Sequence, residues 1–226
     1  MKSTLFNMTA VLLGITFVSS SVVGLVNMIT VDPIAQAKEA AKQAALKQVL
    51  PEFDATKNED LVIDDLTTTV YTASNAGEVT GYAVETATMN GFGGEVRLMV
   101  GFTTEGKVYN INVLQQAETP GLGTNMTKED NNLIRSIKGF NPSEKKLVNG
   151  QLAVRKDGGD VDALTAATIS SRAYVEAVNR AWSAYKSVAG DAVPEGVSGA
   201  TKQYTEGEMT PETQTEPAAQ EGEKNE

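Results

Sequence analysis

The sequence predicts an α+β protein: an N-terminal transmembrane helix and a helical stalk, then an antiparallel-sheet domain with flanking helices. Three observations indicate this fold class. A long uncharged segment opens the chain, apolar residues alternate through its middle, and an apolar stripe with helical spacing lies near residue 180. The expected units are an anchor at residues 1–31, a stalk at 32–60, a folded domain at 61–190 and an acidic disordered tail at 191–226.

Composition limits the chemistry open to the chain. Its 226 residues include 19 Lys and Arg against 29 Asp and Glu, a formal charge of −10, with no His and no Cys. Disulfides, zinc–thiolate sites, iron–sulfur clusters, His-ligated haem, Cys nucleophiles and His-based triads are therefore excluded, and we expect no metal site. Nucleic acid is not an expected partner, because no basic patch is available to neutralise phosphates. A redox role would require an organic cofactor.

The uncharged segment is long enough to cross a membrane. Residues 5–29, "LFNMTAVLLGITFVSSSVVGLVNMI", carry no charge, and about 20 apolar residues span a bilayer core. A cleaved signal peptide ending at "VSSS" is the alternative, but the run continues well past those serines. Lys2 precedes the span and Asp32 follows it. The positive-inside tendency then favours a cytoplasmic N-terminus, with most of the chain outside the cytoplasm.

A stalk helix is expected directly after the span. Asp32 is a suitable N-cap and Pro33 a suitable first helical residue, and the alanine-rich segment after them continues as helix until Pro51. One face of this helix is predicted to pack against the domain: Ile34, Ala37, Ala41, Ala45 and Val49.

Residues 61–114 show the alternation of β-strands. Val96, Leu98, Val100 and Phe102 alternate in one strand, and "TTEGK" at 103–107 predicts a turn. In the next strand the alternating residues are Tyr109, Ile111 and Val113. Weaker strands are expected near "TTTVYT" at 67–72 and "GYAVETAT" at 81–88. The glycines of "GFGG" at 91–94 are interpreted as turn residues.

The segment "ETPGLGTNM" at 118–126 follows the sheet. Pro120 and Gly121 fit the central positions of a type II turn, and Gly123 would let backbone amides approach a planar or anionic ligand. By propensity alone, this segment is an ordinary turn.

Two smaller elements are expected between that segment and the last helix. A short helix would begin in a capping box of Thr127 and Asp130, bury Leu133, Ile134 and Ile137, and end at Gly139. A hairpin follows, in which "NG" at 149–150 is the turn.

The last helix is the most strongly patterned element. Val175, Val178, Trp182 and Tyr185 form one apolar stripe, and Gly190 ends the helix. The 36 residues beyond it are acidic, rich in Pro, Gly and Thr, and poor in large apolar residues, which predicts disorder.

A cluster of hydroxyl side chains lies where this helix begins. "LTAATISS" at 164–171 holds Thr165, Thr168, Ser170 and Ser171 beside the small Ala166 and Ala167. One hydroxyl could cap the helix, but a cap does not explain four. A helix N-terminus also favours phosphate, and small neighbours would leave the Thr168 hydroxyl accessible. The residues alone leave two interpretations, an ordinary cap and a phosphoester-linked threonine.

A family resemblance distinguishes these interpretations. "DALTAATIS" at 162–170 resembles the flavinylation motif Asp-x-x-Ser/Thr-Gly-Ala-Thr-x-Ser/Thr, and "ETPGLG" at 118–123 resembles the signature of the same FMN-binding domain family. Together with the N-terminal anchor, the arrangement is similar to G subunits of the Rnf complex, an ion-translocating ferredoxin:NAD oxidoreductase. The C subunits of sodium-translocating NADH:quinone reductases share both motifs but are usually longer.

The resemblance implies a cofactor and the residues that hold it. A flavin transferase would esterify the phosphate of FMN onto Thr168, with Asp162 helping it to recognise the site. The residues expected to contact the cofactor are Glu118, Thr119, Gly121, Leu122, Gly123, Leu164, Thr165, Ala166 and Ala167. Two positions depart from the family pattern: Ala166 stands where glycine is usual, and Gln116 where histidine is common. A second "SGAT" ends at Thr201, without the upstream aspartate, and is interpreted as coincidence.

The resemblance also implies a function. The chain would be a single-pass electron-transfer subunit of a membrane redox complex, without catalytic residues of its own, and its partners would be the other subunits. Ion movement would belong to those subunits, because a single span without ionisable residues forms no pathway. The alternatives are the FMN subunit of the quinone reductase and a membrane-anchored assembly module without redox chemistry.

Overall fold

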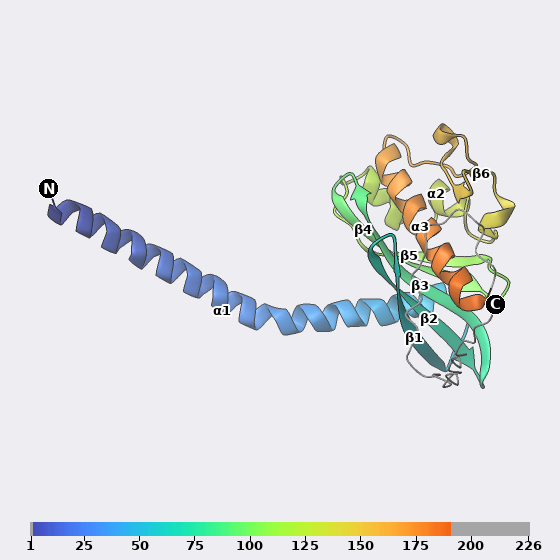
Figure 1. The fold of residues 1–226 in the computed structure, drawn as a ribbon, viewed down its shortest axis with the longest axis horizontal. Helices are drawn as coiled ribbons and strands as arrows, with labels where there is room; N and C mark the ends of the chain where they lie inside the picture. Colours follow the sequence, from blue (N-terminus) through green and yellow to red (C-terminus); the bar gives the residue numbers. More distant parts are fainter. Residues whose placement is uncertain (1, 191–226) are drawn as a thin grey trace, which may run out of the picture.

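The structure, a computed structural model, describes residues 2–190 (Figure 1). The predicted tail at 191–226, including Thr201, lies outside the described residues. The described part contains, in chain order, α1 (Lys2–Val49), β1 (Ala55–Ile63), β2 (Leu66–Asn75), β3 (Glu78–Gly91), β4 (Gly94–Thr103), β5 (Val108–Gln115), η1 (Gly123–Thr127), α2 (Asn132–Arg135), η2 (Pro142–Glu144), β6 (Leu147–Val148), β7 (Gln151–Leu152), η3 (Arg155–Asp157) and α3 (Thr168–Ala189).

The predicted antiparallel sheet is confirmed. Its five strands follow chain order, β1-β2-β3-β4-β5, and each pairs antiparallel with the next. The end of α1 packs on β4 and β5, and α3 crosses the sheet on β3 and β4 (Figure 1). The sheet begins at Ala55, so residues 55–60, which were expected in the stalk, form an edge strand instead.

Two apolar clusters lie on opposite faces of the sheet. The larger one lies under α3 and contains the predicted stripe of Val175, Val178, Trp182 and Tyr185. The smaller one lies under the end of α1. Because both faces are covered at the centre, β3 and β4 are buried along most of their length and do not simply alternate.

The alternation predicted for β5 is wrong at its start. Val108 is fully buried, whereas Tyr109 is 42% exposed. The register of β4 and β5 shifts here, since Phe102 pairs with Val108 and Gly101 pairs with Asn110. Tyr109 is thus the extra residue of a β-bulge, and one extra residue moves a side chain to the other face.

The short helix before α3 differs from the prediction at both ends, because α2 spans Asn132–Arg135 and ends four residues before Gly139. Asn131, rather than Thr127 with Asp130, caps α2, because its side chain accepts a hydrogen bond from the Ile134 N–H. The predicted burial of Leu133, Ile134 and Ile137 is confirmed. So is the hairpin at "NG", where both turn residues have positive φ, 53° and 77°.

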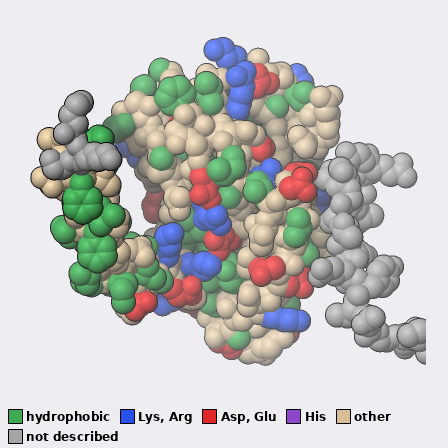
Figure 2. All heavy atoms as spheres, turned by 60° about the vertical axis from the view of Figure 1, so that its left-hand side comes forward, with side chains coloured by type: hydrophobic (Ala, Val, Ile, Leu, Met, Phe, Trp, Pro, Cys, Tyr) green, Lys and Arg blue, Asp and Glu red, His purple; other side chains and the backbone are tan. Residues whose placement is uncertain are grey.

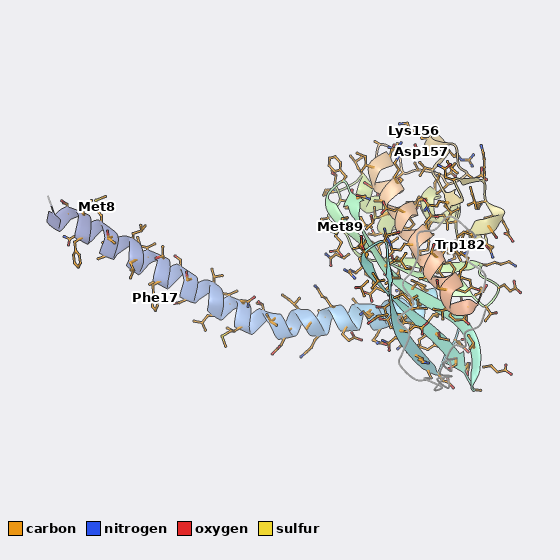
Figure 3. The ribbon with its side chains drawn as sticks, viewed as in Figure 1. Met8, Phe17, Met89, Lys156, Asp157 and Trp182 are labelled. Carbon is orange, nitrogen blue, oxygen red and sulfur yellow. The ribbon has the colours of Figure 1, made fainter. Side chains whose placement is uncertain are left out.

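The anchor and the stalk form one continuous helix. No new helix begins at Asp32, because α1 runs through Pro33 to Val49. Proline inside a helix removes one hydrogen bond and kinks the axis, and α1 bends about midway in Figure 1. Its N-terminal part is long and apolar enough to cross a membrane, with a mean hydropathy of 2.0. Its hydrophobic side chains cover the free part of the helix (Figure 2), and Met8 and Phe17 lie on this part, far from the domain (Figure 3).

Only the last turns of α1 pack against the sheet. Ala45, Leu46, Val49 and Leu50 are buried, whereas Ile34, Ala37 and Ala41, which were predicted to share this contact, are exposed. Gly101 permits the close approach, because a Cβ there would lie 1.6 Å from the carbonyl oxygen of Val49. The amides of Asn110 and Asn112 donate to the backbone and side-chain oxygens of Gln48, at 3.0 and 2.5 Å.

An ion-pair network extends this contact by one turn. Glu85 accepts from Lys42 at 3.0 Å and from Arg97 at 3.3 Å, and the Tyr71 hydroxyl lies 3.4 Å away. Partial burial acts to lower the pKa of Lys42, but the hydrogen bond and charge of Glu85 outweigh it and raise that pKa. The charged pair therefore adds to the packing that joins α1 to the domain.

We predict that Gly101→Ala destabilises the domain and loosens the end of α1. The new methyl group would overlap the Val49 carbonyl, and such overpacking costs about 1–3 kcal/mol. Thermal unfolding of the full-length chain in detergent, followed by near-ultraviolet circular dichroism, measures the effect. Gly14→Ala is the control, because nothing lies within 4 Å of its Cβ position. Equal melting temperatures for the two variants would contradict the prediction.

Candidate functional site

The "ETPGLG" segment forms a fixed turn after β5. The N–H of Leu122 donates to the Thr119 carbonyl at 3.1 Å, and Gly121 has a φ of +78°. These features confirm the predicted type II turn, whose third position requires positive φ. Gln116, in the position where histidine is common, accepts the N–H of Glu118 at 2.7 Å and so helps to hold the same segment.

Glu118 connects this turn to two other segments. Its side chain is 5% exposed. One carboxylate oxygen accepts from the backbone N–H of Gly93 at 3.1 Å, and the other accepts from the Ser170 hydroxyl at 2.5 Å. The β3–β4 turn and the first turn of α3 therefore both bind the same buried side chain. Charge-assisted hydrogen bonds of this kind are among the strongest in proteins.

Glycines allow the three segments to approach this closely. A Cβ at Gly123 would lie 2.6 Å from Ser170 Oγ, and one at Gly91 would lie 2.6 Å from Glu118 Oε1. A Cβ at Gly93 would lie 1.9 Å from the carbonyl oxygen of Ala117. The turn interpretation of "GFGG" is thus incomplete, because two of its glycines also make room for Glu118 and its neighbour.

Residues 162–167 lead into α3 through a second set of polar contacts. The N–H of Leu164 donates to Ser171 Oγ at 2.9 Å, and the Ser171 hydroxyl donates to the Ala167 carbonyl at 2.9 Å. Asp162 is paired with Arg155 at 2.5 Å, and its backbone N–H donates to the Ser136 hydroxyl at 3.1 Å. The segment is therefore fixed at both ends.

No side chain caps the start of α3. The N-cap position is Ala167, and the cap makes no side-chain hydrogen bond. Ser170 donates to Glu118 and Ser171 donates back to the chain, so neither caps the helix. The capping interpretation of the hydroxyl cluster is therefore wrong. The first N–H groups of a helix have no partner within it, which leaves this end suited to an anion.

Ala166 adopts a conformation that usually belongs to glycine. Its φ is +59°, in the left-handed region. This explains in physical terms why glycine is usual at this position of the motif, since a Cβ there costs roughly 1–2 kcal/mol. The chain retains the backbone geometry despite the substitution.

The two motifs line one open pocket of about 300 Å³. Thr119, Leu122 and Gly123 lie on one side and residues 166–170 on the other, and Phe92 of the β3–β4 turn adds a further wall. Among the predicted cofactor contacts, Thr119, Leu122, Gly123, Ala166, Ala167 and Thr168 therefore come together. The other predicted residues do not line the pocket: Glu118, Gly121, Leu164, Thr165 and Asp162. Thr168 itself is half-buried.

Three pocket residues were not among the predicted contacts: Phe92, Ile169 and Ser170. The aromatic residue between the glycines of "GFGG" was the available sequence signal for Phe92, but glycine-rich turns are common. A larger hollow of about 560 Å³ lies at the foot of α1, with Lys47, Phe53 and Tyr109 in its walls. It contains no motif residue, so the smaller pocket is the candidate site.

Ion pairing and burial fix the surroundings of the first turns of α3. Arg172 donates to both carboxylate oxygens of Asp157, at 2.7 and 2.5 Å, and this hydrogen bonding lowers the pKa of Asp157. Figure 3 shows Lys156 and Asp157 near the start of the helix. Burial raises the pKa of the Tyr174 hydroxyl well above its usual range, so that this side chain is neutral.

Comparison with known proteins agrees with this site. Residues 91–183 match the family model of the FMN-binding domain, a stretch that begins at the glycine turn and includes both motifs. A protein of Shewanella amazonensis, named as the G subunit of an ion-translocating oxidoreductase complex, is 33% identical over 190 residues, which cover 80% of this chain and 87% of that protein. The chain belongs to this G-subunit family.

Other members extend the same relationship. The G subunit of Vibrio cholerae is 34% identical over 174 residues, covering 73% of this chain and 82% of its own length. That of Aliivibrio fischeri is 31% identical over 197 residues, which cover 82% of this chain and 92% of that protein. The resemblance to the G subunit of an ion-translocating oxidoreductase is confirmed.

We predict that Ser170→Ala destabilises this G-subunit domain. The substitution removes the donor to a buried oxygen of Glu118, and an unsatisfied buried group costs about 1–3 kcal/mol. Ser187→Ala is a matched control on the same helix, because Ser187 is exposed and hydrogen-bonds only within the helix. Its effect should stay within about 0.5 kcal/mol. Denaturant unfolding of both variants tests the difference, and equal stabilities would show that the Ser170–Glu118 contact is unimportant.

We predict that Ala166→Gly, in contrast to Ser170→Ala, increases the stability of the domain. Removing the Cβ from a left-handed residue should stabilise the fold by up to about 1 kcal/mol. Ala167→Gly, at the next residue with a φ of −132°, should destabilise it by about 0.5–1 kcal/mol through lost rigidity and burial. Thermal unfolding of the two variants shows whether each substitution raises or lowers the melting temperature. A lower melting temperature for Ala166→Gly than for the unmodified chain would contradict the strain at this position.

Proposed function

We propose that the chain is the electron-transfer subunit of a membrane-bound ion-translocating oxidoreductase, and that it carries FMN joined through its phosphate to Thr168. The observation that carries the proposal is the position of Thr168. It lies in the pocket formed by both motifs, at the uncapped end of α3. The match to the FMN-binding domain and the names of the G-subunit relatives support the cofactor and the redox role.

The pocket residues fit FMN in three respects. Thr168 is only half-buried and lines the pocket, so a phosphoester could form on its hydroxyl there. The free amides and the dipole of the 22-residue α3 favour a phosphate at that position. Phe92, Leu122 and Ile169 supply apolar walls for a planar ring, and ligand pockets of this kind are mostly apolar. Bound FMN would supply the electron-carrying chemistry.

The residues of the chain would attach, orient and shield the cofactor. Thr168 would keep it from diffusing away outside the cytoplasm. Glu118 would hold the three segments of the pocket together, although it does not line the pocket itself. Such a protein turns over no substrate alone, because its electron donor and acceptor are cofactors of its neighbours.

The partners follow from the same proposal. The flavin transferase would reach Thr168 from solvent, with Asp162, held in place by Arg155, as part of its recognition site. The other partners are subunits of the complex, in line with the names of the relatives. They would move the ion, because the apolar part of α1 at residues 5–29 holds no ionisable side chain.

The expected topology is a single pass through the cytoplasmic membrane. Lys2 precedes the apolar part of α1, and positive charge favours the cytoplasmic side. The flavin domain would then lie on the extracytoplasmic side, where covalent attachment prevents loss of the cofactor.

We predict that Thr168→Ala abolishes covalent flavin in the full-length chain produced with its transferase. Intact mass should show a gain of one FMN less one water for the unmodified chain and for Thr168→Ser, and no gain for Thr168→Ala. In-gel fluorescence of denatured protein should agree. Ser187→Ala is the matched control, because Ser187 is an exposed hydroxyl of the same helix outside both the motif and the pocket. An unmodified chain without the mass gain would overturn the proposal.

A further inference from the structure

Phe92 is an exposed aromatic residue at the candidate pocket. It lines the candidate pocket, and yet its side chain is 67% exposed. Leu122 and Ile169 share this combination, at 40% and 49% exposed. Single exposed apolar residues are ordinary, but three that converge on one pocket form a surface that a ligand would cover.

We propose that Phe92 is the aromatic wall against which the isoalloxazine ring of the flavin stacks, with Leu122 and Ile169 as the facing apolar surface. The inference deepens the proposed function, and it rests on FMN being attached at Thr168. It assigns a binding role to the β3–β4 turn, which lies outside both motifs.

The backbone that carries Phe92 is held on both sides. Gly93 donates its N–H to Glu118, and neither Gly91 nor Gly93 has room for a Cβ against residues 117–118. A turn that only reversed the chain would not need this double attachment to another loop. The attachment fixes where the Phe92 ring can lie, because only two side-chain torsions remain free.

The chemistry of the three side chains suits a flavin ring. A phenyl ring stacks on a planar aromatic system in an offset or edge-to-face arrangement, and it adds no charge or hydrogen bond. Burial of the exposed Phe92, Leu122 and Ile169 surfaces against the ring would remove apolar area from water. The ring would thereby be shielded from solvent by Phe92 on one side and by Leu122 and Ile169 on the other.

The attachment of the phosphate limits where the ring can go. Thr168 lies in the same pocket as Phe92 and directly before Ile169. A cofactor fixed there through its phosphate is concentrated beside these walls by its own tether, so even a modest stacking contact is populated. Stacking therefore needs no enclosed cavity.

Phe92→Trp tests the contact directly. An indole in contact with a flavin quenches the flavin fluorescence, because it transfers an electron to the excited flavin ring. The electron then returns to the indole. We expect the FMN-loaded, full-length Phe92→Trp variant to lose most of its flavin emission while it keeps the covalent mass. Phe140→Trp is the control, since Phe140 is 43% exposed but does not line the pocket. Its emission should be unchanged. The natural Trp182 is present in every variant.

Phe92→Ala provides the second arm. The flavin of this variant should become several-fold more accessible to quenching by iodide, and its visible circular dichroism should be lost. In both measurements, Phe140→Ala and Phe92→Tyr should match the unmodified chain. Unchanged flavin emission in Phe92→Trp, or unchanged iodide quenching in Phe92→Ala, would overturn the stacking role of Phe92. If these variants still show the mass gain of covalent FMN, the proposed function is retained. Absence of covalent flavin from the unmodified chain would overturn both.

Discussion

The buried carboxylate of Glu118 is the contact on which the site depends. It accepts hydrogen bonds from Gly93 in the β3–β4 turn and from Ser170 in α3, and it belongs to the loop after β5. The pairing of β4 with β5 brings the β3–β4 turn and the loop after Gln115 to the same end of the sheet, and Glu118 joins the start of α3 to them. A charged group at this depth is costly unless it is paired or hydrogen-bonded, so the three segments are stable only as a set. The pocket is the space that this arrangement leaves on its outer side.

Much of this fold was predictable from periodicity. The stripe on α3, the shared core face of Val96, Leu98, Val100 and Phe102 in β4, and the turns at 119–122 and 149–150 depend on local sequence, and the structure confirms them. The start of β5 was not predictable, because a bulge inserts one residue and reverses the alternation at Tyr109. The role of the "GFGG" glycines was missed for another reason. Gly91 makes room for the Glu118 side chain and Gly93 for the Ala117 backbone, and no local sequence pattern indicates contacts with such distant residues.

The helix start predicted at Asp32 and Pro33 does not occur in the structure. Aspartate followed by proline is a good helix start, yet α1 continues through Pro33 with a bend. Its last turns are part of the domain, since Leu46 and Val49 are buried and Gly101 leaves space for the Val49 backbone. The membrane helix therefore joins the flavin domain through a helix rather than a flexible linker, and this restricts the directions in which the pocket can face.

The start of α3 has two locally unfavourable features, the backbone conformation of Ala166 and the missing side-chain cap at Ala167. Ala166 is in the left-handed region, and Ala167 leaves the first N–H groups of the helix uncapped, although hydroxyl residues are present on either side. A sequence selected for stability alone would place glycine at 166 and let a serine or threonine cap the helix. Instead Ser170 is turned toward Glu118 and Thr168 toward the pocket. Departures from local rules concentrate at functional sites, and here they coincide with the position of Thr168 in the pocket, which suits the phosphoester proposed above.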